Sequence, residues 1–300
     1  MSKIRVFIQA ARLRTLPLSV SGIIMGSALA FRVGHFRWDI FGLALCTTIL
    51  FQVLSNFAND YGDGVKGTDN ANRIGPERVL QSGKVSRTEM KKVVVFTALL
   101  SVVSSLVLIY ISFGQENLFY VLIFFLLGII CVVAAIKYTV GKSAYGYRGL
   151  GDVFVFIFFG LVSVLGSYFL YVHQLNWKLF LPATAVGLLS VAVLNLNNMR
   201  DYQNDKAMGK NTLVVKMGSE LAKYYHYYLV VVAMVCMLAF SVLNFQTRWQ
   251  LLYILLFIPL IRHLLFVKHN TNLKKLDNQL KVVALSTFLL SILFFVGQIL

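Results

Sequence analysis

The sequence predicts an all-α protein that crosses a membrane nine times. Of its 300 residues, 58% are hydrophobic and only 13% are charged, whereas roughly 25% of the residues in a soluble domain are charged. The apolar residues gather into segments of roughly 20, the length that a helix needs to cross the hydrocarbon core of a bilayer. Because these segments recur evenly along the chain, we expect a single membrane domain over residues 1–300.

The first apolar segment begins near Leu16, and no small-residue cleavage site follows a short apolar core. We therefore expect a retained first helix rather than a signal peptide that is removed. The connections between the apolar segments differ in length: long polar ones alternate with short ones such as GQEN (114–117). The predicted spans are 15–31, 38–58, 93–113, 118–136, 152–172, 179–199, 225–245, 249–267 and 282–299.

Basic residues are shared unequally between the two sides of this bundle. If the N-terminus lies in the cytoplasm, the 28 Lys and Arg residues all fall on the inner side except Arg32, Arg37, Lys178 and Arg248. This asymmetry predicts a cytoplasmic N-terminus and an outer C-terminus. It also explains the net charge of +16, so we expect no nucleic-acid partner.

Cysteine and histidine do not indicate a site. Cys46, Cys131 and Cys236 lie in separate apolar runs without a second Cys or a His at zinc spacing, so we expect neither disulfides nor a thiolate metal site. The five histidines are scattered, and we interpret them as interface or structural residues.

A first polar cluster follows the second predicted span, in SNFANDYGDGVKGTD (55–69). If the helix continues past residue 58, then Asn56, Asn59, Asp60 and Asp63 fall at i, i+3, i+4 and i+7, which is one helical face. Glycines then loosen the backbone, so we expect Asp69 to come from a loop.

A second cluster follows the sixth predicted span, in LNLNNMRDYQNDKAMGKNTL (194–213). Asn197, Asp201 and Asp205 fall at i, i+4 and i+8, again on one face, with Arg200 and Lys210 beside them. Both clusters follow even-numbered spans, so they are predicted to lie on the same, cytoplasmic side. We therefore expect the function on that side.

Carboxylates and carboxamides are hard oxygen ligands, which suit Mg²⁺ shared with substrate phosphates. Basic residues in the same connections would hold phosphate oxygens directly, so the pattern indicates a diphosphate site. The alternative is solvation of helix ends with local ion pairing, and the positive-inside rule is an alternative for each base. The candidate diphosphate-binding residues are Lys66, Arg73, Arg78, Lys137, Arg200 and Lys210.

These residues resemble the UbiA superfamily of intramembrane aromatic prenyltransferases. The family pattern N-D-x-x-D matches Asn59, Asp60 and Asp63, and D-x-x-x-D matches Asp201 and Asp205. The first motif departs from the family where Gly67 stands in place of a further Asp. Four other stretches look like the subgroup that acts on 1,4-dihydroxy-2-naphthoate in menaquinone biosynthesis. They are RLRTLP (12–17), GPERVLQSG (75–83), YRGLGDVFVFIFFG (147–160) and NNMRDYQNDKAMGKNTL (197–213).

The resemblance implies nine helices around a central cavity, capped by the two acidic loops, in the bacterial cytoplasmic membrane. Polyprenyl diphosphate would bind through Mg²⁺, with its tail in an apolar groove open to lipid. The prenyl group would pass to 1,4-dihydroxy-2-naphthoate with loss of diphosphate and CO₂. Another aromatic acid such as 4-hydroxybenzoate is an alternative acceptor. A cation-coupled transporter or a CDP-alcohol phosphotransferase is an alternative of a different class.

Such a reaction passes through an allylic cation, which must be shielded from water and which aromatic faces attract. The stripe FVFIFF (154–159) is a candidate lining, with packing in the core or against lipid as the alternative. A base at the phenolic acceptor would assist, and Asp69, Tyr138 and Lys142 are the candidates near the loops. Spacing does not choose among these three residues.

Overall fold

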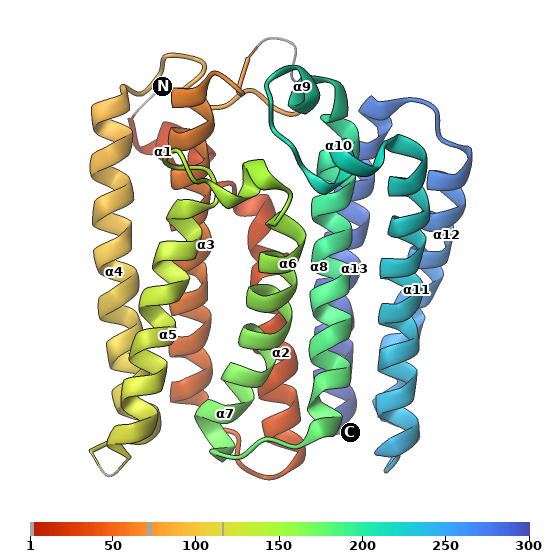
Figure 1. Ribbon diagram of the computed structural model, residues 1–300. Coiled ribbons are helices and arrows are strands. Elements are labelled where there is room, and N and C mark those ends of the chain that lie inside the picture. The colour runs from red at the N-terminus through yellow and green to blue at the C-terminus, as the bar shows by residue number, and fades with distance from the viewer. Residues whose placement is uncertain (1–2, 71–73, 116) are drawn as a thin grey trace.

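The computed structural model describes residues 3–70, 74–115 and 117–300. Over these residues the chain is helical without strands, and nine helical segments are long and apolar enough to cross a membrane. Figure 1 shows one bundle with the N-terminus at its upper end and the C-terminus at its lower end. The spans found in the described chain are Lys3–Arg32, Trp38–Lys66, Arg87–Phe113, Leu118–Lys137, Gly151–Val172, Trp177–Arg200, Ser219–Leu243, Arg248–His269 and Leu273–Ile299. The predicted all-α membrane fold is confirmed, and the differences lie at the ends of the spans.

The first span is broken near its start, at Arg12. Its elements are α1 (Lys3–Ala11), the 3₁₀ turn η1 (Leu13–Thr15) and α2 (Leu16–Arg32). Arg12 has a φ of 52°, a left-handed conformation that is uncommon for residues other than glycine. The first predicted span begins only at residue 15, later than this helical segment. α1 forms because Val6 and Ala10 bury one of its faces in a cluster with Leu54 of the second span.

The second span continues through the first polar cluster. The next elements are α3 (Trp38–Lys66), α4 (Arg87–Phe113) and α5 (Leu118–Lys137). Gly67 follows α3 in the left-handed conformation, with a φ of 74°, and ends the helix. α4 begins before the predicted residue 93, because Ser86 and Glu89 form a capping box. The Glu89 carboxylate accepts a bond of 2.9 Å from the backbone N–H of Ser86.

The fifth span contains a π-helix. The elements from here are η2 (Tyr145–Arg148), α6 (Gly151–Val155), η3 (Phe156–Gly166) and α7 (Ser167–Val172). The segment η3 is π-helical, a form that is rare and occurs frequently at functional sites. It lies against the next span at Gly160, where an added Cβ would lie 2.6 Å from the Cα of Gly187. The two backbones therefore touch where neither residue has a side chain.

The rest of the chain completes the bundle. Its elements are η4 (Trp177–Leu179), α8 (Phe180–Arg200), α9 (Tyr202–Ala207), α10 (Leu213–Met217), α11 (Ser219–Leu243), η5 (Arg248–Leu256), α12 (Phe257–His269), η6 (Leu273–Lys275) and α13 (Leu276–Ile299). The last span starts well before the predicted residue 282, because polar side chains between 274 and 281 lower its hydropathy without interrupting the helix.

Both polar clusters lie at one end of the bundle, which we call the site end. There α3 and α8 terminate, α9 follows the end of α8, and α10 lies beside the last turns of α8 (Figure 1). The predicted placement of both clusters on the same side is therefore confirmed. The cytoplasmic orientation of that side stays a prediction from the charge asymmetry.

A half-buried polar cluster joins the helices at the opposite end. The Arg32 guanidinium donates to Gln250 Oε1 at 3.2 Å, to Gln298 Oε1 at 3.0 Å and to the carbonyl oxygen of Asn244. These bonds connect the end of α2 to η5, to α13 and to the segment that follows α11. The guanidinium thus holds these segments together at this end of the bundle.

Replacing Arg32 by Ala should therefore lower stability while leaving the distant site intact. We expect the thermal midpoint in detergent to fall by about 5 °C, since a half-buried charged donor that bonds three segments is lost. Arg37→Ala is the matched control, because the Arg37–Asp39 ion pair is exposed and such pairs contribute little. Equal midpoints for the two variants would contradict this role for Arg32.

Candidate active site

The first polar cluster occupies one buried face of α3, as predicted. Its members make different contacts. Asn56 donates to the carbonyl oxygen of Ala11 at 2.8 Å and so ties α3 to the break before α2. Asn59 Oδ1 accepts from the Thr139 hydroxyl at 3.2 Å, which joins α3 to the end of α5. Asn56 therefore holds two helices together and lines neither of the two cavities at this end of the bundle. Asn59 lines both of these cavities.

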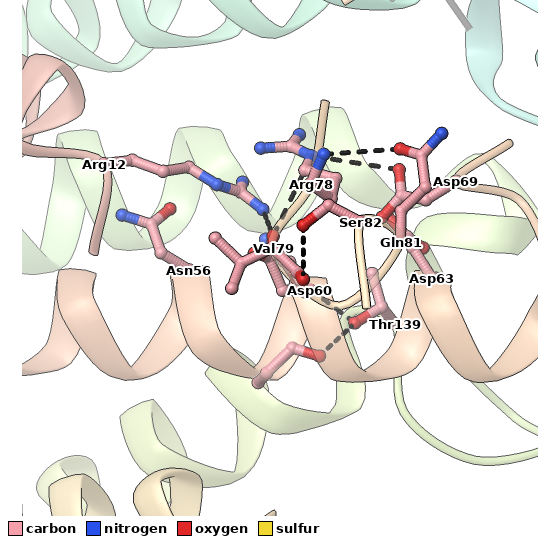
Figure 2. A network of polar contacts seen from close by, with 12 residues as sticks. Arg12, Asn56, Asp60, Asp63, Asp69, Arg78, Val79, Gln81, Ser82 and Thr139 are labelled. Atoms are coloured by element: carbon pink, nitrogen blue, oxygen red, sulfur yellow. Dashed lines mark hydrogen bonds and ion pairs between the residues drawn. The ribbon is translucent and has the colours of Figure 1, made fainter. Parts of the chain in front are cut away.

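Asp60 is almost completely buried, with 1% of its surface exposed, and two arginines contact it. Arg12 forms an ion pair with Asp60 Oδ1, and Figure 2 shows Arg78 beside the same carboxylate. Arg78 Nε lies 3.8 Å from Asp60 Oδ1 and 3.8 Å from Asp69 Oδ1. The left-handed turn at Arg12 thus brings a basic side chain from the N-terminal segment onto the first motif.

Lys210 connects the two acidic motifs. Its Nζ lies 3.9 Å from Asp63 Oδ2 and 3.9 Å from Asp205 Oδ1. Asp63 Oδ1 also accepts a bond of 2.7 Å from the Tyr147 hydroxyl. The structure therefore brings together clusters that are more than a hundred residues apart in the sequence.

The second motif is organised around Arg200, which is 1% exposed. Its Nε and Nη2 donate to the two oxygens of Asp201 at 3.0 and 2.7 Å. Nη2 also donates to Asn197 Oδ1 at 2.8 Å, and Nη1 donates to Asp277 Oδ1 of α13 at 2.5 Å. Burial of this guanidinium is compensated by its bonds to two carboxylates.

A polar cavity of about 240 Å³ lies between the motifs. The motif residues that line it are Asn59, Asp63, Asp69, Asn197, Asp201 and Asp205, with Arg12, Arg78, Arg200 and Lys210 among the bases. Asp60 is not a lining residue, but the arginines that contact it are. Residues of both polar clusters therefore face the same cavity.

An apolar cavity of about 350 Å³ adjoins the polar one. Residues that line both cavities include Gln52, Asn59, Tyr138 and Leu194. From the aromatic stripe 154–159, the lining side chains are Phe154, Val155, Phe158 and Phe159. Part of the stripe therefore lines the apolar cavity, which agrees with its interpretation as a lining rather than as packing alone.

The donor set of the polar cavity fits a magnesium ion chemically, because it consists of carboxylate and carboxamide oxygens. Within the described residues, no three His, Cys, Asp or Glu side chains form a cluster that could hold a metal ion as they stand. Their carboxylates lie against basic side chains instead. Binding of a cation would therefore require the carboxylates to exchange these partners.

Other predicted residues lie farther from the cavities. Lys66 packs over the ring of Tyr147, with its Nζ 3.7 Å from the ring centroid. Lys137 and Lys142 are exposed and line neither cavity. Arg73 lies outside the described residues. These placements leave Arg78, Arg200 and Lys210 as the predicted bases that reach the polar cavity.

Of the predicted proton acceptors, Tyr138 and Asp69 reach the site. Burial and the nearby carboxylates of Asp152, Asp63 and Asp205 raise the pKa of the Tyr138 phenol. The phenol therefore keeps its proton and can donate a hydrogen bond where the two cavities adjoin. Asp69 lines the polar cavity beside Arg78.

Sequence reasoning did not identify Arg12, Tyr147 or Asp277 as site residues. Each reaches the motifs from a distant element, and each contact depends on how helices pack. The only signal was that Arg12 and Tyr147 begin stretches that resemble the UbiA superfamily. Asp277 had no signal of this kind.

Comparison with known proteins agrees with this geometry. A family model described as the UbiA prenyltransferase family matches residues 19–293. The chain is 41% identical to 1,4-dihydroxy-2-naphthoate octaprenyltransferase of Escherichia coli (strain K12), over 99% of this chain and 96% of that protein. It is 42% identical to the protein of the same name from Haemophilus influenzae, over 98% and 96% of the two chains.

Solved structures share the fold at lower identity. A UbiA homolog from Archaeoglobus fulgidus bound to GPP and Mg²⁺ superimposes with a TM-score of 0.67 at 14% identity, covering 96% of this chain and 98% of that one. A digeranylgeranylglyceryl phosphate synthase superimposes with a TM-score of 0.63 at 21% identity, covering 100% and 99%. With the family match and the identities above, they establish that the chain belongs to the UbiA prenyltransferase family and is an integral membrane prenyltransferase.

Proposed function

We propose that the chain transfers a polyprenyl group from polyprenyl diphosphate to 1,4-dihydroxy-2-naphthoate, with Mg²⁺ as cofactor and with release of diphosphate and CO₂. The site would face the cytoplasm in a bacterial inner membrane. The observation that carries this proposal is the polar cavity, lined by both acidic motifs and by basic side chains, next to an aromatic-lined apolar cavity. The activity named for the bacterial relatives supports the choice of acceptor.

The polar cavity would receive the diphosphate. Asp63, Asp201 and Asp205, with Asp60 and the carboxamides, would hold Mg²⁺, which when bound supplies positive charge to the leaving diphosphate. Homolog structures described with GPP or DMAPP and Mg²⁺ support this assignment. Arg12, Arg78 and Lys210 would exchange carboxylate contacts for phosphate oxygens.

Arg200 would have a different part. Its donors are directed to Asp201, Asp277 and Asn197, so it orients the second motif. A contact between Arg200 and diphosphate, as the sequence suggested, would require one of these bonds to exchange.

The apolar cavity would hold the first isoprene units and shield the allylic cation. Tyr145 and Phe154 stack at 3.8 Å between ring centroids, and Phe158 continues this wall. Their faces would attract the cation while the apolar lining excludes water. The tail would continue toward the lipid.

The bonding changes of this reaction balance without removal of a ring proton. The C–O bond to diphosphate breaks, and its electron pair leaves with the diphosphate. The ring carbon that bears the carboxylate forms the new C–C bond, and the C–CO₂⁻ electron pair returns to the ring as CO₂ departs. The groups near the acceptor therefore need to orient its hydroxyls rather than remove a ring proton, a part that the protonated Tyr138 phenol suits.

The first experiment offers purified protein a long-chain prenyl diphosphate with Mg²⁺ and one aromatic acid at a time. We expect prenylated product from 1,4-dihydroxy-2-naphthoate, with equal amounts of diphosphate and CO₂, and loss of turnover in EDTA that Mg²⁺ restores. Product from 4-hydroxybenzoate instead would replace the acceptor. The absence of product with any acceptor, in folded protein, would reject the proposal.

Replacing Asp201 by Asn should reduce turnover by about 100-fold or more, because charge that stabilises the leaving group is held less well. Asp39→Asn is the matched control, since Asp39 lies at the opposite end of α3 in an exposed ion pair. Steady-state rates with folded, purified variants measure the effect. Wild-type turnover by Asp201→Asn would remove the second motif from the site.

Replacing Phe154 by Leu should increase the fraction of prenyl diphosphate that is hydrolysed to prenyl alcohol, because the cation loses an aromatic face and part of its shield. The ratio of prenyl alcohol to prenylated acceptor measures this. Phe119→Leu is the control, since Phe119 of α5 is exposed on the outside of the bundle. An unchanged ratio in Phe154→Leu would contradict the proposed wall.

A further inference from the structure

Tyr147 lies where three connections at the site end meet. It belongs to η2, between α5 and α6, and its hydroxyl donates to Asp63 Oδ1 at 2.7 Å. The Thr68 hydroxyl, in the connection after α3, lies 2.6 Å from the same phenolic oxygen. The backbone N–H of Asn211, between α9 and α10, donates to the Tyr147 carbonyl oxygen at 3.2 Å. One residue therefore links the segments that carry both motifs.

The direction of these hydrogen bonds follows from the chemistry of the groups. An ionised carboxylate only accepts, so the single phenolic proton points to Asp63, and the Thr68 hydroxyl donates to the phenolic oxygen. Asp63 Oδ1 is thus held by Tyr147, whereas Oδ2 lies 3.9 Å from Lys210 Nζ.

The ring of Tyr147 also contacts two basic side chains. Lys66 Nζ lies 3.7 Å from the ring centroid, and Lys210 Nζ lies 5.4 Å from it. Both distances permit attraction between the ammonium group and the aromatic ring. Lys210 is the base that contacts Asp63 and Asp205 together. Tyr147 itself lines neither cavity, so it would act through these neighbours.

We propose that Tyr147 is a positioning residue, which orients Asp63 and Lys210 for binding of the metal ion and the prenyl diphosphate. This inference rests on the proposed function, because it requires that these two side chains serve those ligands. Groups that orient metal ligands by hydrogen bonding commonly change metal affinity by about 10–100-fold when they are removed. The phenol and the ring contribute separately, so they can be tested separately.

The variant Tyr147→Phe keeps the ring and removes the bond to Asp63. We expect the dissociation constant for Mn²⁺, used as a probe of the divalent site and followed by electron paramagnetic resonance, to rise about tenfold. The Mg²⁺ concentration for half-maximal turnover and the KM for prenyl diphosphate should rise with it. The value of kcat at saturating Mg²⁺ and donor should stay near that of the wild type.

Lys216→Met is the matched control for a role in loop packing alone. Lys216 Nζ donates to the carbonyl oxygen of Arg148 at 2.6 Å, so it anchors the same connection. It forms no ion pair with a carboxylate of the described residues. This variant should bind Mn²⁺ as tightly as the wild type, even if its thermal midpoint falls.

The inference is overturned if Tyr147→Phe binds Mn²⁺ with wild-type affinity, or if Lys216→Met weakens binding as much. Failure of the proposed function has a different signature. The wild-type protein would then bind Mn²⁺ no more tightly than Asp63→Asn and Asp201→Asn, and that result would overturn both proposals.

Discussion

The structure depends on the compensation of carboxylates that are buried at one end of an apolar bundle. Charges placed there are costly unless opposite charges and hydrogen bonds accompany them. Asp60 is accompanied by Arg12 and Arg78, and Asp201 by Arg200. The side chains of these three arginines are themselves largely buried. The acidic motifs therefore constrain the position of the segments that carry these basic residues.

This requirement accounts for irregular features of the fold. The helix break at Arg12 places its guanidinium on the first motif, at the cost of a left-handed residue. Lys210 lies between Asp63 and Asp205, so the connection that carries it must lie over the end of α3. The same ion pairs that stabilise the cap also place basic side chains around the polar cavity. The arrangement that compensates the buried carboxylates is thus the same one that would receive a diphosphate in the proposed function.

The two adjoining cavities divide the chemistry of a prenyl donor between them. Charged groups line the polar cavity, and aromatic and aliphatic groups line the apolar cavity. Asn59 and Tyr138 line both. An allylic diphosphate has the same division, since its anionic head and its apolar chain meet at the carbon that reacts. In the proposed function, the bond that breaks would therefore lie where the two linings meet, and the acceptor would bind near Tyr138, which lines both cavities.

The sequence by itself determined the all-α fold, the nine spans of the described residues and the α3 face that carries the first motif, because hydropathy and helical spacing are local properties. The second motif was predicted on one continuous helical face, but α8 ends at Arg200 and α9 begins at Tyr202, so the helix is interrupted at Asp201. The sequence also misplaced the starts of the first and last spans, since polar residues can continue a helix without contributing to an apolar segment. Only the tertiary structure decided that Arg12, Tyr147 and Asp277 contact the motifs, and that Lys137 and Lys142 do not line the cavities. Such contacts join residues that are distant along the chain, and their formation depends on how the helices pack.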